Sequence, residues 1–225
     1  MNSCETFTAN KGEHVSIYID SSDLNHIQAS CKSGWVEGVT TNPLLLAKGG
    51  MTAHSLLSAI KQLCPGPIFY QLMATEFDQM ISEAYQAREI LDKQLVLKLP
   101  PNELGFSVCA QLSSKFTCCP TAIYSPAQAL IASEAGAQFI AVYVNRATRL
   151  MGDGVQLVRD ITAVLRGGNT ELLAASLKSP IEATEALVAG AQHLTLPYET
   201  LVQMSKHELS AAAIDEFQKD GVGLI

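Results

Sequence analysis

The stretch Gln94-Leu95-Val96-Leu97-Lys98-Leu99-Pro100-Pro101 is an apolar run that holds a single lysine. It is short, rich in leucine and valine, and apolar on both faces. It stops at two prolines, which cannot continue a ladder of hydrogen bonds. This pattern is typical of a parallel strand that is covered by helices on both sides. Lys98 is the exception, because charged side chains are rarely buried without a partner.

Two interpretations of Lys98 are open from this strand alone. In the first, the side chain lies at the strand end and extends its ammonium group to water or to a carboxylate, as most lysines do. In the second, a dry pocket with apolar walls favours the neutral amine, which can then attack a carbonyl. The residues at the ends of the other strands decide between them.

The composition predicts one large globular domain. The chain has 225 residues, of which 48% are hydrophobic and 16% are charged, and its length suits a single α/β barrel. A formal charge of −7 argues against a nucleic-acid partner or an anionic membrane surface, which would need a basic face. No run of about eighteen apolar residues could span a bilayer. We therefore expect a small-molecule substrate and no membrane or nucleic-acid partner.

The two ends of the chain and its cysteines lead to further expectations. Residues 1–14 are polar and lack the apolar segment of a secretory signal, so we expect a flexible extension, a catalytic domain over 15–225 and a cytoplasmic location. The six cysteines follow no C-x-x-C spacing, which predicts reduced thiols rather than a zinc site. Cys118 and Cys119 are adjacent on one predicted strand and should point to opposite faces.

Short apolar runs alternate with helical stretches from His14 onward, and this alternation is the signature of βα units around a parallel sheet. Asp23 is a predicted N-cap, Thr75 with Asp78 resembles a capping box, and Pro180 suits the first position of a helix. The predicted strands are 15–19, 36–39, 68–73, the lysine strand, 116–121, 138–144, 172–176 and 193–196. Eight such units with further helices at the C-terminus predict a (β/α)8 TIM barrel.

Polar residues recur at the C-terminal ends of these strands, where a barrel gathers side chains into one pocket. They are Asp20, Thr41, Asn42, Gln71, Lys98, Thr121, Tyr143, Asn145, Arg146, Ser176 and Lys178. Each has a structural alternative when taken alone: Asp20 can cap a helix, Asn42 can form an ordinary turn, and Tyr143 can belong to the core. Their coincidence around one lysine favours the nucleophilic interpretation of Lys98.

The same residues carry a resemblance to a known family. The motifs are Ile17-Tyr-Ile-Asp20-Ser-Ser-Asp23, Gly38-Val-Thr-Thr-Asn-Pro43, Tyr70-Gln-Leu-Met-Ala-Thr75, Val96-Leu-Lys98-Leu-Pro100, Thr121-Ala-Ile-Tyr124, Tyr143-Val-Asn-Arg146 and Ala174-Ala-Ser176-Leu-Lys178. In this order, over residues 15–220, they resemble the small transaldolases, and most closely the fructose-6-phosphate aldolase branch.

The resemblance implies a class I aldol mechanism that uses no metal and no other cofactor, with a Schiff base on Lys98. It further implies roles for the polar residues: Asp20 and Tyr143 for proton transfer, Gln71 and Thr121 for orienting a water, Thr41 and Asn42 for holding the lysine or substrate hydroxyls, and Arg146, Asn145 and Ser176 for the substrate and its phosphate. A homo-oligomer, either a pentamer or a decamer, is also implied.

Two reactions fit this chemistry. Two positions commonly divide the family. Transaldolases have a glutamate at the first and a phenylalanine at the second, whereas the aldolase branch has a glutamine and a tyrosine. This sequence has Gln71 and Tyr143 at these positions. We therefore expect reversible cleavage of fructose 6-phosphate to dihydroxyacetone and glyceraldehyde 3-phosphate. The alternative is a transaldolase that moves a dihydroxyacetone unit between sugar phosphates, and a remote one is a barrel that binds a sugar phosphate without reaction. The five histidines are scattered, which disfavours a metal-dependent aldolase.

Overall fold

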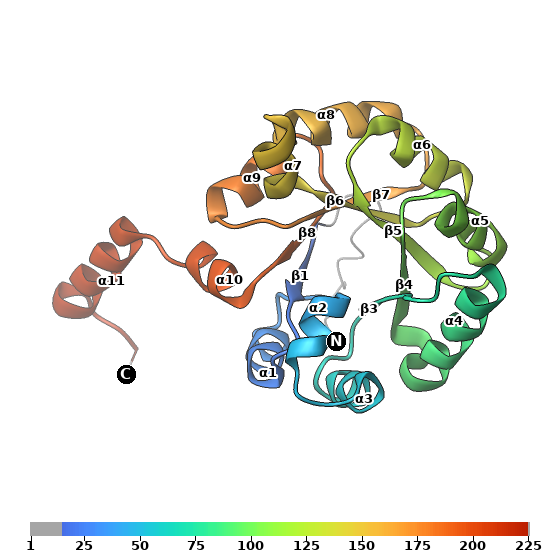
Figure 1. Ribbon diagram of the computed structural model, residues 1–225. Helices are drawn as coiled ribbons and strands as arrows, with labels where there is room; N and C mark the ends of the chain where they lie inside the picture. Colours follow the sequence, from blue (N-terminus) through green and yellow to red (C-terminus); the bar gives the residue numbers. More distant parts are fainter. Residues whose placement is uncertain (1–14, 225) are drawn as a thin grey trace, which may run out of the picture.

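The computed structural model describes residues 15–224 and shows a closed barrel of eight parallel strands, each paired with its neighbours in sequence order (Figure 1). The predicted (β/α)8 barrel is confirmed. The strands are β1 (Ser16–Asp20), β2 (Gly38–Thr40), β3 (Ile68–Gln71), β4 (Leu95–Leu99), β5 (Thr117–Ile123), β6 (Phe139–Tyr143), β7 (Glu171–Ala175) and β8 (His193–Leu196). The proposed extension at 1–14 lies outside the described residues.

The chain forms helices that surround the barrel and a last helix that stands apart from it (Figure 1). They are α1 (Leu24–Lys32), α2 (Pro43–Lys48), α3 (Ala53–Leu63), α4 (Phe77–Leu91), η1 (Asp92–Gln94), α5 (Glu103–Leu112), α6 (Pro126–Glu134), α7 (Val144–Met151), α8 (Gly154–Val164), α9 (Pro180–Val188), α10 (Tyr198–Met204) and α11 (Glu208–Asp220). No helix in the described part of the chain is both long and apolar enough to cross a membrane.

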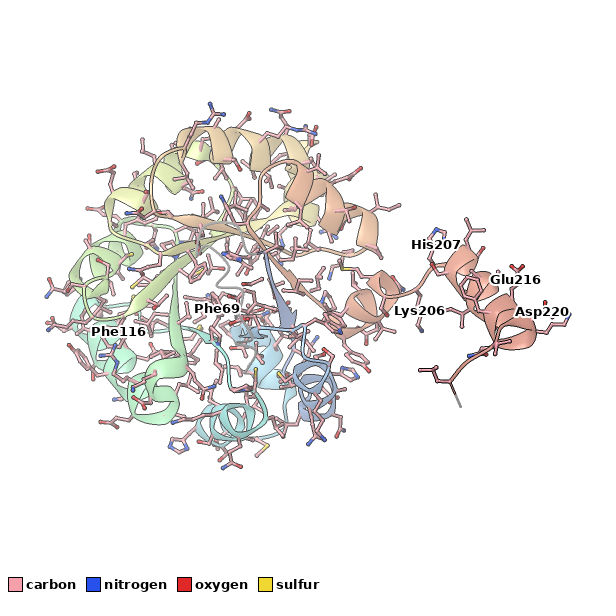
Figure 2. The ribbon with its side chains drawn as sticks, turned by 180° about the vertical axis from the view of Figure 1, so that it is seen from behind. Phe69, Phe116, Lys206, His207, Glu216 and Asp220 are labelled. Carbon is pink, nitrogen blue, oxygen red and sulfur yellow. The ribbon has the colours of Figure 1, made fainter. Side chains whose placement is uncertain are left out.

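The strands separate two cores because successive side chains point to opposite faces of a sheet. Side chains that point outward pack beneath the helices and form the larger core. The side chains that point inward and fill the barrel are Tyr18, Phe69, Val96, Cys119, Ala141 and Leu173. Figure 2 shows Phe69 near the centre of the ring of strands. As predicted, Cys118 and Cys119 lie on opposite faces, the first in the outer core and the second inside the barrel.

Local signals placed some helix ends correctly and missed others. Asp23 caps α1 by accepting hydrogen bonds from the backbone N–H groups of Asn25 and His26, and Pro180 opens α9, as predicted. The capping box at Thr75 and Asp78 is wrong, because Glu76 is the N-cap of α4 and makes no side-chain cap bond.

A residue within α4 holds the loop before that helix instead. Glu83 accepts hydrogen bonds from the N–H groups of Met73 and Ala74 and from the Tyr70 hydroxyl. A carboxylate can accept several hydrogen bonds at once, so one side chain satisfies the backbone of the turn that follows β3.

Two helices lie where the sequence predicted only turns or loops, namely α2 and α7. α7 begins directly at the end of β6, and only Thr41 and Asn42 separate α2 from β2. Asn42 caps α2 and Pro43 opens it, whereas Tyr143 is at once the last residue of β6 and the N-cap of α7. β5 is longer than predicted and continues past a register shift at Ala122, whose φ of 57° lies in the left-handed region. Such strain in a residue other than glycine is often found at functional sites.

The last helix, α11, stands apart from the barrel (Figure 1). None of its residues is buried, and Figure 2 shows Glu216 and Asp220 on this separate segment. Leu209 and Phe217 expose 75% and 69% of their surface. The sequence predicted helices at the C-terminus, but their periodicity did not indicate that this one would leave the body of the protein.

Candidate active site

A cavity of about 630 Å³ opens at the C-terminal ends of the strands. The residues that line it are Asp20, Thr40, Asn42, Pro43, Leu44, Leu45, Lys48, Gln71, Met73, Lys98, Ala122, Ala141, Tyr143, Arg146, Leu173, Ala175, Ser176, Lys178 and Thr195. The C-terminal face is where barrel enzymes carry out their chemistry, since loops and strand ends converge there. Eight of the eleven polar residues that were predicted at the strand ends line this cavity: Asp20, Asn42, Gln71, Lys98, Tyr143, Arg146, Ser176 and Lys178.

Lys98 is buried, with 5% of its surface exposed, although every other residue of β4 is apolar. Its Nζ atom lies 2.9 Å from the backbone oxygen of Thr41 and donates a hydrogen bond to it. The side chain therefore does not extend to bulk water, which was the first interpretation of this lysine. One carbonyl positions the amine at the cavity.

Asp20 is the carboxylate of the cavity. Its Oδ1 accepts a hydrogen bond from the Thr40 hydroxyl at 2.9 Å, and the Thr40 Oγ1 lies 2.6 Å from the Thr195 Oγ1. Burial of the carboxyl raises the pKa of Asp20, and the positive charge of Lys98, the hydrogen bond from Thr40 and the charge of Lys178 lower it in part. A buried carboxyl that faces a lysine and a hydroxyl is suited to accept a proton in a reaction.

Tyr143 and Arg146 form a stacked pair at the start of α7. The guanidinium carbon of Arg146 lies 4.9 Å from the centre of the Tyr143 ring, within the range of a cation–π interaction. Because both side chains line the cavity, the stacking holds an arginine over the site in a defined direction. A planar guanidinium of this kind binds phosphate with two parallel hydrogen bonds.

Ser176 follows Ala175, which pairs in register with Tyr143, and has a φ of 59°, the left-handed conformation that favours glycine. Such a backbone persists only when the surrounding structure enforces it. Two strained residues line the cavity: Ala122 lies near the end of β5, and Ser176 directly follows β7.

The charge of the cavity is opposite to that of the protein. Lys48, Arg146 and Lys178 line it together with Lys98, whereas Asp20 is its one acidic residue among those described. The whole chain carries a formal charge of −7. A cationic cavity in an anionic protein concentrates anionic ligands at that point of the surface, and the effect weakens as salt screens it.

Three predicted site residues do not line the cavity. The Thr41 hydroxyl donates to the Phe69 backbone oxygen, so its contact with Lys98 is made by its own backbone oxygen. Asn145 donates to Glu182 at 2.5 Å and thereby links α7 to α9. Thr121 is 2% exposed, and its hydroxyl has no hydrogen-bond partner in the described structure.

The sequence analysis missed Thr40, Thr195 and Lys48. Thr40 and Thr195 lie on strands β2 and β8 and face the interior. The sequence predicted that β2 would end before Thr40, so the inward direction of the Thr40 side chain could not be inferred from the strand pattern. In β8 the pattern His193-Leu-Thr-Leu196 does indicate an inward-facing Thr195, because side chains alternate along a strand and Thr195 therefore lies on the same face as His193. Lys48 belongs to α2, a helix that was not predicted.

Among residues 15–224, no group of three or more histidine, cysteine, aspartate or glutamate side chains could hold a metal ion. The cysteines of this part of the chain are free thiols: Cys31, Cys64, Cys109, Cys118 and Cys119. Cys4 lies outside the described residues. The chemical groups that line the cavity are three lysine amines, one guanidinium, one carboxylate, hydroxyls and amides.

Comparison with known proteins identifies the family. The model of the transaldolase/fructose-6-phosphate aldolase family matches residues 17–222. A protein of Symbiobacterium thermophilum named "Probable transaldolase" is 39% identical over 209 residues, which cover 92% of this chain and 96% of the relative. A protein of the same name from Geobacter metallireducens is 34% identical over 209 residues, covering 92% of this chain and 97% of that protein.

Among solved structures, the thiamine phosphate pyrophosphorylase of Pyrococcus furiosus matches with a TM-score of 0.60 at 13% identity, over 94% of this chain and 98% of that one. At this identity the likeness concerns the barrel fold and not the activity. The family match, in contrast, covers nearly all of the barrel and every residue that lines the cavity. The chain therefore belongs to the transaldolase/fructose-6-phosphate aldolase family.

Proposed function

We propose that this protein is a class I aldolase that reversibly cleaves fructose 6-phosphate to dihydroxyacetone and glyceraldehyde 3-phosphate. The observation that carries the proposal is Lys98, a buried amine that faces a cavity with a carboxylate, a tyrosine and several cations. An amine in such surroundings forms an imine with a ketone. The protonated imine then accepts the electrons that the breaking carbon–carbon bond leaves behind.

The mechanism assigns the proton transfers to Asp20 and Tyr143. Lys98 Nζ attacks C2 of the ketose, and loss of water gives the imine. Asp20 removes the proton of the C4 hydroxyl as the C3–C4 bond breaks and glyceraldehyde 3-phosphate leaves. The Tyr143 hydroxyl returns a proton to C3 of the enamine, and water then releases dihydroxyacetone and the free lysine. General acid–base steps of this kind contribute about 10²- to 10⁴-fold each.

The remaining polar residues support these steps. Gln71 lines the cavity, and the hydroxyl of Thr121 is buried without a protein partner, which is consistent with a role for both in orienting a water. Asn42 uses its Oδ1 to cap α2, so its Nδ2 is the atom we assign to a substrate hydroxyl. We assign the phosphate to Arg146 and Ser176.

A transaldolase is the second candidate, and the names of the relatives favour it. Both reactions pass through the same enamine and differ in what accepts the dihydroxyacetone unit. Gln71 and Tyr143 favour the aldolase, because a tyrosine hydroxyl can protonate the enamine and let the ketone leave. A phenylalanine at this position would leave the enamine to wait for an aldehyde.

The deciding experiment measures glyceraldehyde 3-phosphate released from fructose 6-phosphate, with and without erythrose 4-phosphate. The proposal expects release without the acceptor. Release that requires erythrose 4-phosphate would establish the transaldolase instead. The Tyr143→Phe variant should become dependent on the acceptor. Tyr124→Phe is the matched control, since Tyr124 packs against Tyr143 with ring centres 6.1 Å apart but does not line the cavity.

The resemblance also implies an assembly and a location. We propose a homo-oligomer of five or ten subunits in the cytoplasm that acts on a small sugar phosphate. Light scattering on the purified full chain measures the subunit number directly. A monomer at micromolar concentration would refute the proposed assembly without affecting the proposed chemistry.

A further inference from the structure

A chain of hydroxyl groups crosses three neighbouring strands and ends at Asp20. Thr195 belongs to β8, Thr40 belongs to β2, and Asp20 lies on β1 between them. The two threonine oxygens are 2.6 Å apart, and the Thr40 oxygen lies 2.9 Å from Asp20 Oδ1. Thr40 is 1% exposed and Thr195 4% exposed, so water does not compete for these contacts.

The number of protons fixes the direction of this chain. Each hydroxyl has one proton to donate, and an ionised carboxylate can only accept. The proton of Thr40 is directed to Asp20, so the Thr40 oxygen must accept the proton of Thr195. The donation therefore runs from Thr195 to Thr40 to Asp20.

We propose that Thr195 is a positioning residue, which acts through Thr40 to orient the Asp20 carboxylate and to favour its ionised form. Consecutive hydrogen bonds polarise one another, so the bond from Thr40 to Asp20 is stronger when Thr40 also accepts one. Thr195 lines the cavity, but the proposed role requires no contact between its side chain and the substrate. This role rests on the proposed function only in that Asp20 serves there as the base.

The surroundings of Asp20 explain why such support is needed. Burial raises the pKa of this carboxyl, and a base is useful only when it is unprotonated. The charged and titratable groups that face the same cavity are Lys98 from β4, Lys48 from α2, Tyr143 and Arg146 from β6 and α7, and Lys178 after β7. Lys98 and Lys178 oppose the effect of burial by their charge, and the hydroxyl chain does so by hydrogen bonding.

The test removes one hydroxyl while keeping the shape of the side chain. Thr195→Val should lower kcat roughly two- to tenfold, in line with the loss of one hydrogen bond, and should move the acid limb of the pH profile to higher pH. Thr195→Ser should restore both properties. In the Thr40→Val background, Thr195→Val should have no further effect on the acid limb, because its action passes through Thr40.

Thr170→Val is the matched control. The Thr170 hydroxyl is also buried and donates to the Ala137 backbone oxygen at 2.7 Å, but it lies outside the cavity. This variant should lower thermal stability without moving the acid limb. If Thr195→Val behaves in the same way, or if serine does not restore the profile, Thr195 has only a structural role and the proposal is wrong.

A second readout does not depend on the reaction. Carbon-13 NMR of protein labelled at the aspartate carboxyls follows the titration of Asp20 directly, with Asp20→Asn to assign its signal. The midpoint should rise in Thr195→Val and return in Thr195→Ser. An unchanged midpoint would overturn the proposal even in an active aldolase. A raised midpoint in a protein without aldolase activity would support the hydroxyl chain and refute the proposed function.

Discussion

The two ends of the barrel interior differ in how their polar groups are satisfied. At the N-terminal end of the strands, His193 Nδ1 accepts a hydrogen bond from the Ser16 backbone N–H, and its Nε2 lies 2.9 Å from Glu171. The rings of Tyr18 and Phe139 pack edge-on against the imidazole. This end has the properties of a stabilising core, in which polar atoms have partners and rings fill the space.

The C-terminal end is built in the opposite way. Lys98 is buried in an apolar strand, the Thr121 hydroxyl lacks a partner, and the backbones of Ala122 and Ser176 are strained. Each of these features costs stability. They lie at or beside the cavity, so the comparison indicates that the C-terminal end is organised for chemistry and the N-terminal end for stability.

The largest expected effect comes from removing the base at the C-terminal end. Asp20→Asn should lower kcat by about 10²- to 10⁴-fold, the range of a general base, while the protein stays folded. The wild-type pH profile should show an acid limb, because ionised Asp20 is lost as the pH falls through its raised pKa. Steady-state kinetics over pH measures both effects. Near-normal turnover in Asp20→Asn would remove Asp20 from the mechanism.

Arg146→Ala should separate substrates by charge. Loss of a charge-assisted contact costs about 1.5 to 3 kcal/mol, so kcat/KM for phosphorylated substrates should fall roughly 10- to 150-fold. Reactions of unphosphorylated dihydroxyacetone with a neutral aldehyde should change little. Equal losses on both kinds of substrate would assign Arg146 a structural role. Arg149→Ala, on the same helix but outside the cavity, is the control.

At the N-terminal end, His193→Phe should affect stability and not catalysis. The new ring fits among aromatic neighbours, but it leaves the Ser16 N–H and Glu171 without their partner. The free energy of unfolding should fall by about 1 to 3 kcal/mol, measured by urea denaturation. The kcat of the folded variant should match the wild type. A large loss of kcat would mean that the two ends are not independent.

The smallest expected effect is an increase in the free energy of unfolding rather than a decrease. Thr121→Val removes a buried hydroxyl that has no partner in the described structure, so it should raise the free energy of unfolding by about 1 kcal/mol. The kcat should fall, because we assign this hydroxyl to the orientation of a water. A variant that is less stable than the wild type would show that the hydroxyl has a hydrogen-bond partner in the folded protein in solution, either a bound water or a protein group.

The sequence predicted the barrel well, for a physical reason. Buried parallel strands are continuous apolar runs, and the stretch around Lys98 is such a run. The sequence therefore indicated both that this strand is buried and where it ends. The helices α2 and α7 were missed because each is short and starts at, or within a few residues of, a strand end. A short helix of this kind is held by its neighbours more than by its own periodicity.

For the site, the sequence identified eight side chains that line the cavity but could not give their contacts. The choice between Thr40 and Thr41 depends on which of two adjacent residues points inward, and a shift of one residue reverses that direction. Glu83 accepts hydrogen bonds from the loop after β3, and Glu182 accepts them from the loop before α9 and from Asn145. The sequence did not indicate either role, because glutamates are common on the exposed faces of helices.

The central claim is that Lys98 forms the covalent intermediate, and borohydride trapping tests it most directly. Incubation with fructose 6-phosphate or dihydroxyacetone, reduction and peptide mapping by mass should place the adduct on Lys98. Lys98→Arg should fold and carry no adduct, because a guanidinium does not become a neutral amine at these pH values. Lys48 and Lys178 line the same cavity and are internal controls. An adduct on either of them, or no adduct at all, would contradict the account.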